Sequence, residues 1–273
     1  MSGTSTGTNT GTVPDTVPQK TAGVTLPALI RSAALRSRCR ERGPPSASER
    51  QLAPQSCDDC AVTRVRAVLF DWRGTLADAP KHAERVDRAL AAIARTGSPE
   101  LVGRAVCALE VAGSLPGIDT SFALHRAATI GALTNEGIDP ELAEAIYAVD
   151  LDPASHPVFP DAADVLRELR EAGVRIVLTS DFHVDLRPDL AANGIGYLID
   201  DYVISVEHGV QKPDPGFFRL ALRAAGVGAD EALMVGDRPE YDGGAVALGI
   251  PVLILPPHRG AAPRGLRLVL DLV

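Results

Sequence analysis

From Val65 onward, short apolar segments alternate with stretches of helical periodicity, and this alternation constrains the fold more than any other feature of the sequence. Most of these apolar segments are rich in β-branched residues, as are strands that are buried on both faces. Strands that alternate with helices form βαβ units and a parallel sheet. We therefore predict an α/β fold, with a Rossmann-like parallel sheet core and helices on both faces. The predicted strands span residues 65–70, 174–180, 201–206, 231–236 and 251–255.

The interval between the first two predicted strands breaks this rhythm. Residues 79–158 contain no convincing strand, but they contain several stretches with helical periodicity. Ser98 and Asp139 are suitable helix N-caps, each followed by an acidic residue in the first turn. An insertion of about 80 residues is too long for an ordinary connection. We predict that residues 79–158 form a helical cap domain, and that residues 63–78 and 159–273 form the Rossmann-like core.

The first 62 residues differ in composition from the rest of the chain. They are rich in Thr, Gly, Ser and Pro, and such a segment cannot bury enough apolar surface to offset its chain entropy. We predict that residues 1–62 are a disordered, low-complexity N-terminal extension. Cys57 and Cys60 form a CxxC motif there, but it lacks the second pair of ligands that a zinc site needs.

Charge and hydropathy limit the classes of partner. The formal charge of −8 argues against a nucleic-acid binder. The sequence has no apolar run of the ~18 to 20 residues that a membrane span needs, and no signal-peptide pattern. Four cysteines in 273 residues are too few for a disulfide framework. We expect a cytoplasmic monomer or homodimer that acts on a small molecule, without a nucleic-acid or membrane partner.

Four polar segments follow successive predicted strands at their carboxyl ends, where an open α/β sheet binds its ligand. Taken singly, each has a structural explanation, because Asp71 and Asp237 suit turns or helix caps and Lys212 suits the surface. Taken together, four polar strand ends that converge on one crevice predict a functional site. The segments are DWRGT (71–75), TSD (179–181), QKPDP (211–215) and GDRPEYD (236–242).

These segments, in this order and with a helical insertion after the first, resemble the four motifs of the haloacid dehalogenase-like hydrolase superfamily. The resemblance covers about residues 65–258. It implies that Asp71 is the nucleophile and that Lys212 neutralises both Asp71 and the transferred group. It further implies two sets of ligands: Ser180, with Thr179 beside it, for the substrate, and Asp71, the backbone carbonyl of Arg73, Asp237 and Asp242 for Mg²⁺.

This assignment is chemically coherent. A carboxylate is already ionised at neutral pH, and the acyl phosphate that it forms is readily hydrolysed. Oxygen ligands beside a phosphoryl group suit Mg²⁺, which needs few carboxylates and keeps several waters. The resemblance implies no nucleotide or organic cofactor. It implies a Mg²⁺-dependent phosphohydrolase that acts on a small phosphorylated metabolite through an aspartyl-phosphate on Asp71.

Arg73 departs from the pattern of the family. Its phosphatases usually carry a second aspartate two residues after the nucleophile, which protonates the leaving oxygen and then activates water. An arginine, with a pKa above about 12, cannot do this. Such proton transfer is commonly worth about 10²- to 10⁴-fold in rate. We predict that Arg73 contacts the anionic part of the substrate or a residue of the cap.

Three functions stay open. The preferred one is a phosphatase whose acid comes from the cap, from Asp181 or from a substrate with a good leaving group. The others are a 2-haloacid dehalogenase-type hydrolase and a regulatory protein that binds phosphate without turnover. Asp237 and Asp242 favour the phosphatase, because a dehalogenase has no need of two metal-site carboxylates. Further candidates for the site are Asp78 and His183, and, in the cap, Lys81, Arg85, Arg88, His125 and Arg126.

Overall fold

The computed structural model describes residues 64–258 and 262–273. The chain divides into two units, residues 1–61 and 62–273, and the described residues belong to the second. The predicted disordered extension and its CxxC motif therefore lie outside the described residues. None of the helices in the described ranges is long and apolar enough to cross a membrane.

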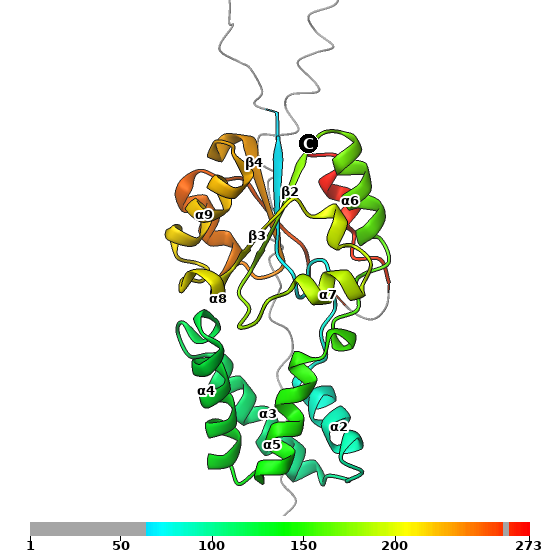
Figure 1. The fold of residues 1–273 in the computed structure, drawn as a ribbon, viewed down its shortest axis with the longest axis vertical. Helices are drawn as coiled ribbons and strands as arrows, with labels where there is room; N and C mark the ends of the chain where they lie inside the picture. Colours follow the sequence, from blue (N-terminus) through cyan, green and yellow to red (C-terminus); the bar gives the residue numbers. More distant parts are fainter. Residues whose placement is uncertain (1–63, 259–261) are drawn as a thin grey trace, which may run out of the picture. The chain divides into compact units, whose positions relative to one another are not determined.

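A five-stranded parallel sheet, in the order β3-β2-β1-β4-β5, forms the centre of the fold (Figure 1). All five predicted strands are present, each shorter than predicted, and the α/β fold class is confirmed. The third strand ends early because Ser205 begins a short helix, and its hydroxyl accepts the backbone N–H of Phe182 at 2.8 Å. The strands are β1 (Ala67–Phe70), β2 (Arg175–Ser180), β3 (Asp201–Ile204), β4 (Ala232–Gly236) and β5 (Val252–Ile254).

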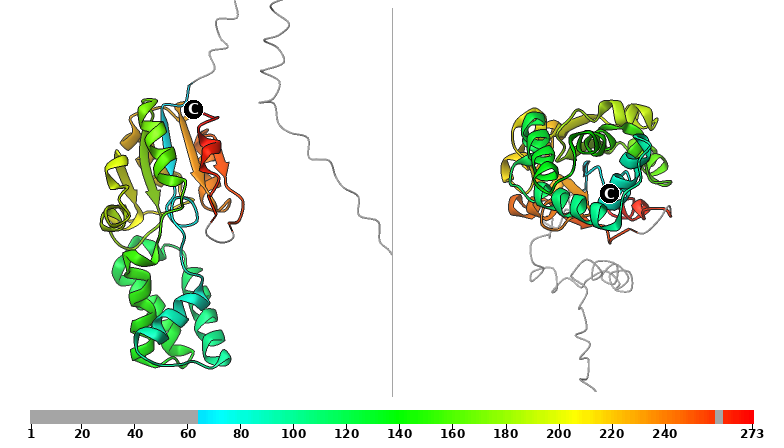
Figure 2. Two further views of the ribbon diagram at one scale, coloured as in Figure 1. Left: turned by 90° about the vertical axis from the view of Figure 1, so that its right-hand side faces the viewer. Right: turned by 90° about the horizontal axis from the view of Figure 1, so that it is seen from below.

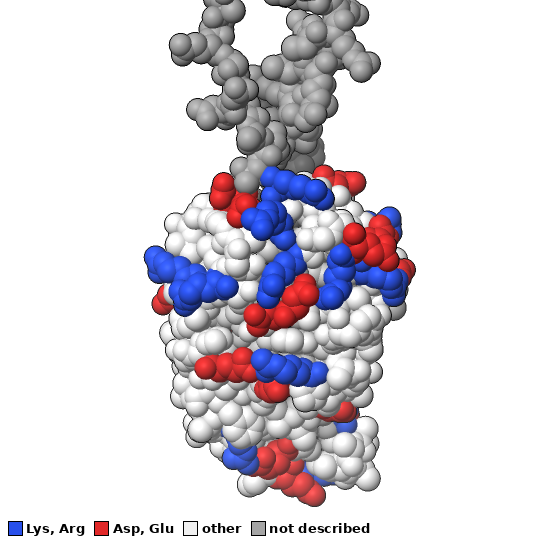
Figure 3. Space-filling model, turned by 45° about the horizontal axis from the view of Figure 1, so that its top comes forward, with Lys and Arg blue, Asp and Glu red and all other residues white. Residues whose placement is uncertain are grey.

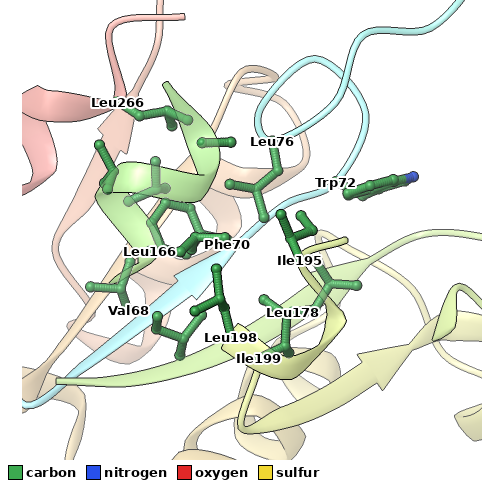
Figure 4. Packing of buried hydrophobic residues seen from close by; sticks show 14 of the residues in the cluster. Val68, Phe70, Trp72, Leu76, Leu166, Leu178, Ile195, Leu198, Ile199 and Leu266 are labelled. Atoms are coloured by element: carbon green, nitrogen blue, oxygen red, sulfur yellow. The ribbon is translucent and has the colours of Figure 1, made fainter. Parts of the chain in front are cut away.

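Helices cover both faces of the sheet because successive residues of the central strand point to opposite sides. Val68 and Phe70 pack against Leu166 on one face, together with Leu76 (Figure 4). Leu69 packs in a second cluster on the other face. The helices of the first face are α6 (Ala162–Glu171), α7 (Arg187–Ala192), η5 (Gly196–Leu198) and η8 (Leu266–Val269). The other helices that follow β2 are α8 (Ser205–His208), α9 (Pro215–Ala225), η6 (Ala229–Glu231) and η7 (Asp242–Leu248).

Four of the five α-helices between β1 and β2 have a hydrophobic cluster of their own, and they form what is here called the helical insertion (Figure 2). Both predicted N-caps are confirmed: the side chain of Ser98 accepts the N–H of Leu101, and that of Asp139 accepts the N–H of Leu142. The insertion comprises α2 (His82–Ala92), α3 (Pro99–Gly113), η3 (Ile118–Thr120), α4 (Phe122–Asn135), α5 (Pro140–Leu151) and η4 (Pro153–Ser155).

The insertion contacts the loops at the carboxyl end of the sheet through η3. The side-chain oxygen of Gln211 accepts the backbone N–H of Asp119 at 3.2 Å, and the Ser205 hydroxyl donates to the Asp119 carbonyl at 2.7 Å. A backbone segment held at both its N–H and its carbonyl has a fixed position. These bonds therefore bring the Asp119 side chain next to the polar segments that follow the strands.

Candidate active site

Asp71 lies at the carboxyl end of the central strand, in a turn that fixes its direction. Its backbone N–H donates to the Val235 carbonyl of β4 at 2.9 Å, so the residue is still tied to the sheet. Gly74 has φ +83°, a conformation that L-residues seldom adopt, and it turns the chain back. The Thr75 hydroxyl then donates to Asp71 Oδ2 at 3.2 Å. The carboxylate is thus presented in one orientation.

Lys212 is the cation of the site, and it is almost completely buried. Its Nζ lies 2.7 Å from Asp71 Oδ1 and 2.6 Å from Asp242 Oδ1. Burial alone would lower the pKa of Lys212, but the carboxylates of Asp71, Asp242 and Asp181 together raise it above its usual value. The ammonium therefore stays charged, with its donors directed at the predicted nucleophile and at the loop after β4.

Three carboxylates meet beside this lysine. One ligand oxygen each from Asp71, Asp237 and Asp242 lies within 4.8 Å of the others. Asp242 Oδ2 accepts the N–H groups of Asp237 and Arg238 at 3.1 and 3.0 Å, which shapes the loop after β4. Asp237 Oδ1 is buried and has no hydrogen-bond partner among the described residues.

The charge balance of this cluster suits a hard divalent cation. Burial raises the pKa of Asp237 to about 6, and the charges of Asp71 and Asp242 add to the rise. Burial also raises the pKa of Asp71, against the opposing effect of Lys212. The single positive charge of Lys212 therefore does not neutralise the three carboxylates of Asp71, Asp237 and Asp242. Because buried, under-compensated oxygens are the ligands that Mg²⁺ prefers, the residues present fit this ion.

A cavity of about 70 Å³ lies against the cluster. Ser180, which is a predicted substrate ligand, lines this cavity, and so does Asp181. Thr179 is placed differently: it is fully buried in β2, and its hydroxyl donates to the Phe70 carbonyl at 3.1 Å. The Thr179 carbonyl accepts from Lys212 Nζ at 3.3 Å. Thr179 therefore contacts the site through its backbone carbonyl, which binds Lys212, and not through its hydroxyl.

The model of the haloacid dehalogenase-like hydrolase family matches residues 65–248, about two thirds of the chain. The chain belongs to this family. The matched range contains all four polar segments and the helical insertion. The family named from the order of the motifs is thereby confirmed, whereas the roles of the individual residues stay predictions.

Three relatives illustrate the range of the similarity. A glyceraldehyde 3-phosphate phosphatase from Methanopyrus kandleri is 32% identical over 184 residues, which cover 65% of this chain and 78% of that protein. A phosphoserine phosphatase from Thermus thermophilus is 40% identical over 103 residues, 37% of this chain and 40% of that protein, so the match spans about two fifths of its length. The structure of L-2-haloacid dehalogenase from Xanthobacter autotrophicus with chloropropionic acid covalently bound has a TM-score of 0.53 at 26% identity, covering 70% of this chain and 77% of that one.

In this hydrolase the side chain of Arg73 is directed toward the insertion. Its Nη1 donates to Asp150 Oδ1 on α5 at 3.0 Å, and its guanidinium carbon lies 4.6 Å from the centre of the Phe182 ring. Arg73 also lines the cavity beside Asp71. The Arg73 side chain therefore connects the sheet part to the insertion and also borders the cavity beside Asp71.

The other candidates separate into two groups. Arg85 and His125 line a second cavity of about 490 Å³ in the insertion, which shares Arg73 and Asp119 with the first. The other candidates line neither cavity: Asp78 accepts the Ala79 N–H in a turn, Lys81 is exposed, Arg88 pairs with Glu84, Arg126 pairs with Glu144, and His183 is buried.

Sequence reasoning missed Asp119, Gln211, Arg238 and Tyr241, which also line the first cavity. Gln211, Arg238 and Tyr241 each carried a signal, since they lie within the strand-end segments 211–215 and 236–242, whereas Asp119 of the insertion carried none.

Proposed function

We propose that the protein is a Mg²⁺-dependent phosphatase that acts on a small phosphorylated metabolite through an aspartyl-phosphate on Asp71. The observation that carries the proposal is the bridge from Asp71 through Lys212 to Asp242, beside an oxygen cluster that fits a hard cation. Curated relatives named as phosphatases of small metabolites favour a phosphoryl group over other substrates of the family.

In the first step Asp71 attacks phosphorus and the ester oxygen departs. Lys212 holds Asp71 Oδ1, and Thr75 holds Oδ2, so the nucleophile does not have to be reoriented. Ser180 is the group proposed to hold a phosphoryl oxygen. Mg²⁺, when held by Asp71, Asp237 and Asp242, supplies neutralisation of the phosphoryl charge. Water then hydrolyses the acyl phosphate, which releases inorganic phosphate and restores Asp71.

The leaving oxygen needs a proton, and we assign its donor to Asp181. Asp181 Oδ1 accepts the backbone N–H of Lys212 at 2.9 Å, which fixes the carboxyl group against the same cavity as Asp71. Burial raises the pKa of Asp181 to about 7, against the effect of Lys212, and the charges of Asp71 and Asp119 add to the rise. A carboxylic acid that keeps its proton near neutral pH is suited to general acid catalysis.

The helical insertion is proposed to act as the cap of this site, with residues 63–78 and 159–273 as its core. Asp119 of η3 lines the cavity that contains Asp71, and the larger cavity continues among residues of α2, α3 and α5. The leaving group of the substrate would extend into that larger cavity.

On the face seen in Figure 3, Lys and Arg lie interspersed with Asp and Glu, so this face offers no continuous basic surface for a polyanion.

Dehalogenation is the second candidate. The similarity to L-2-haloacid dehalogenase and the guanidinium of Arg73 beside the cavity favour it. The three-carboxylate cluster weighs against it, because displacement of halide by a carboxylate requires neither a metal ion nor a proton donor. A regulatory protein that binds phosphate without turnover is the third candidate.

The test is a panel of phosphate monoesters graded by leaving-group acidity, assayed with Mg²⁺ and with EDTA, with Asp71→Asn as the control. Hydrolysis that needs both Mg²⁺ and Asp71 supports the proposal. Chloride release from a 2-haloacid, with the esters left intact, would replace it by dehalogenation. Phosphate binding without turnover on any ester would favour the regulatory protein.

A further inference from the structure

His183 follows β2 and is fully buried, yet neither of its ring nitrogens has a hydrogen-bond partner among the described residues. A neutral imidazole carries one donor and one acceptor, and buried polar groups are nearly always paired. Two carboxylates lie near its ring nitrogens, Asp119 Oδ1 at 3.6 Å from Nδ1 and Asp150 Oδ2 at 3.7 Å from Nε2. These distances are too long for hydrogen bonds. Within the described part of the chain, His183 therefore has no hydrogen-bond partner.

The groups around Nδ1 are suitable ligands for a metal ion. Asp119 Oδ1 lies 3.6 Å from His183 Nδ1 and 3.8 Å from His125 Nε2, and the three ligand atoms lie within 4.8 Å of one another. In a tetrahedral zinc site, Zn–N and Zn–O distances near 2.1 Å separate neighbouring ligand atoms by roughly 3.4 Å. The cluster is thus only slightly more open than such a site.

The second nitrogen of each ring faces a group that would orient it. His125 Nδ1 lies 3.3 Å from the Tyr147 hydroxyl, and His183 Nε2 faces Asp150. A histidine that ligates a metal almost always directs its other ring nitrogen at a carboxylate, a carbonyl or a water. This arrangement leaves His125 Nε2 and His183 Nδ1 directed at Asp119.

We infer that Asp119, His125 and His183 form a binding site for a divalent ion of the Zn²⁺ class, at the junction of the helical insertion and the sheet. Two imidazoles and one carboxylate suit Zn²⁺ and its neighbours, whereas Mg²⁺ prefers oxygen ligands alone. The site shares no residue with the Asp71, Asp237 and Asp242 cluster and does not depend on the proposed phosphatase activity. Asp119 and His125 line the cavity of about 490 Å³, which gives the ion an entry path and a fourth ligand from solvent.

Binding requires a change in the two rings. They stack with centroids 3.4 Å apart and an interplanar angle of 3°. Because the lone pair of an imidazole nitrogen lies in the ring plane, the rings must tilt apart to share one ion. His183 belongs to the sheet part, whereas Asp119 and His125 belong to the insertion. An ion bound by all three would therefore hold these two parts together.

The test is a Zn²⁺ titration of the full chain, stripped with a chelator and measured by calorimetry in excess Mg²⁺. The excess Mg²⁺ competes with Zn²⁺ for the proposed catalytic cluster. The same titration is run on a Cys57→Ser/Cys60→Ser variant, which removes the CxxC motif as a Zn²⁺ site. One Zn²⁺ per chain bound by both proteins, and four-coordinate absorption bands with Co²⁺ in its place, support the site. Binding that is lost with the two cysteines, or no stoichiometric binding, overturns it.

Variants of the ligands locate the ion. His125→Gln and Asp119→Asn should weaken Zn²⁺ binding by more than about 100-fold, and Tyr147→Phe by about 10-fold, as for the loss of an orienting partner. His208→Gln, which replaces an exposed histidine of α8, is the matched control and should leave the affinity unchanged. Because replacing buried His183 can impair folding, its variant is interpreted only with a native circular dichroism spectrum. Unchanged affinity in folded His125→Gln and Asp119→Asn would overturn the inference.

Discussion

The guanidinium of Arg73 and the carboxylate of Asp150 lie 3.0 Å apart, in an ion pair that joins the turn after the central strand to helix α5. Arg85 approaches the same oxygen at 3.1 Å. Burial alone would raise the pKa of Asp150, but the guanidinium groups of Arg73 and Arg85 hold it well below its usual range. Arg73 thus links the insertion to the sheet, at the position where phosphatases of the family carry a proton donor.

Asp150→Asn should lower the free energy of unfolding by about 3 to 5 kcal/mol, because it leaves Arg85 buried without its counter-ion. Urea denaturation at pH 7 measures the change. Since the folded-state pKa is depressed, the contribution is complete above the unfolded value of 3.8 and is lost as the pH falls through the folded value. Asp164→Asn, which removes an exposed pair with Arg167, is the control, with a change of about 0.5 kcal/mol or less. Equal stability of Asp150→Asn and the wild type would show that the pair is not stabilising.

Lys212→Met should abolish phosphatase activity and lower the free energy of unfolding by about 3 to 5 kcal/mol at pH 7, because Asp71 and Asp242 lose their buried counter-ion. The stability loss should become smaller in acid, because burial raises the pKa of Asp71 and its protonation removes one of the uncompensated charges. Lys81→Met removes an exposed lysine and should alter neither quantity. Full turnover by Lys212→Met would rule out its proposed role.

Gly74→Ala should weaken Mg²⁺ binding by at least about 10-fold, a ratio that corresponds to about 1.4 kcal/mol. A Cβ at Gly74 would lie 2.2 Å from Asp237 Oδ2 and would displace that carboxylate. Gly173→Ala is the matched control, because Gly173 has φ +77° but no atom within 4 Å of an added Cβ. Both variants therefore carry the cost of the positive φ, and only Gly74→Ala carries the clash. Similar Mg²⁺ affinities of the two, measured by calorimetry, would exclude Asp237 from the metal site.

Asp181→Asn should lower kcat for alkyl phosphates by about 10²- to 10⁴-fold and much less for aryl phosphates, whose leaving groups need no proton. In the wild type, kcat for alkyl phosphates should decline above pH 7, as Asp181 with its pKa of about 7 loses its proton. An equal loss on alkyl and aryl esters would indicate a role other than proton donation.

The same residue gives a prediction for stability. The pKa of Asp181 rises from 3.8 on folding, so the folded state binds this proton more tightly than the unfolded state. Its favourable effect is complete below pH 3.8 and is lost as the pH rises through about 7. The melting temperature of Asp181→Asn relative to the wild type should therefore be higher at pH 8 than at pH 4. A difference that is constant with pH would mean that Asp181 is not protonated on folding.

The sheet and the convergence of its polar loops could be predicted from the sequence for a simple geometric reason. The carboxyl ends of parallel strands meet at one edge, so strand assignment alone brought Asp71, Lys212 and Asp242 together. Strand parity also bears on Thr179 and Ser180, which are adjacent in β2 and therefore point to opposite faces. Only Ser180 lines the cavity.

The partners supplied by the insertion could not be predicted in this way. Asp150 is 77 positions from Arg73, on a helix whose rotation against the sheet depends on packing and not on periodicity. The same holds for His125 and His183, whose rings stack although one lies in α4 and the other follows β2. Sequence periodicity tells which face of a helix is buried, but it does not tell which residue of another element lies opposite.

The position of β1 in the sheet has a consequence for how the chain acquires its fold on the ribosome. β1 is the central strand and the first to be synthesised, yet Ala67 pairs with Arg175 and Ala232, both more than 100 residues downstream. Until those segments emerge, an entirely apolar strand has no neighbour on either side. Pairings so distant in sequence are slow to form and leave nascent chains prone to aggregation. The helical insertion, which has a hydrophobic cluster of its own and is synthesised before β2, can become compact in the meantime and occupy the interval before the sheet closes around Asp71.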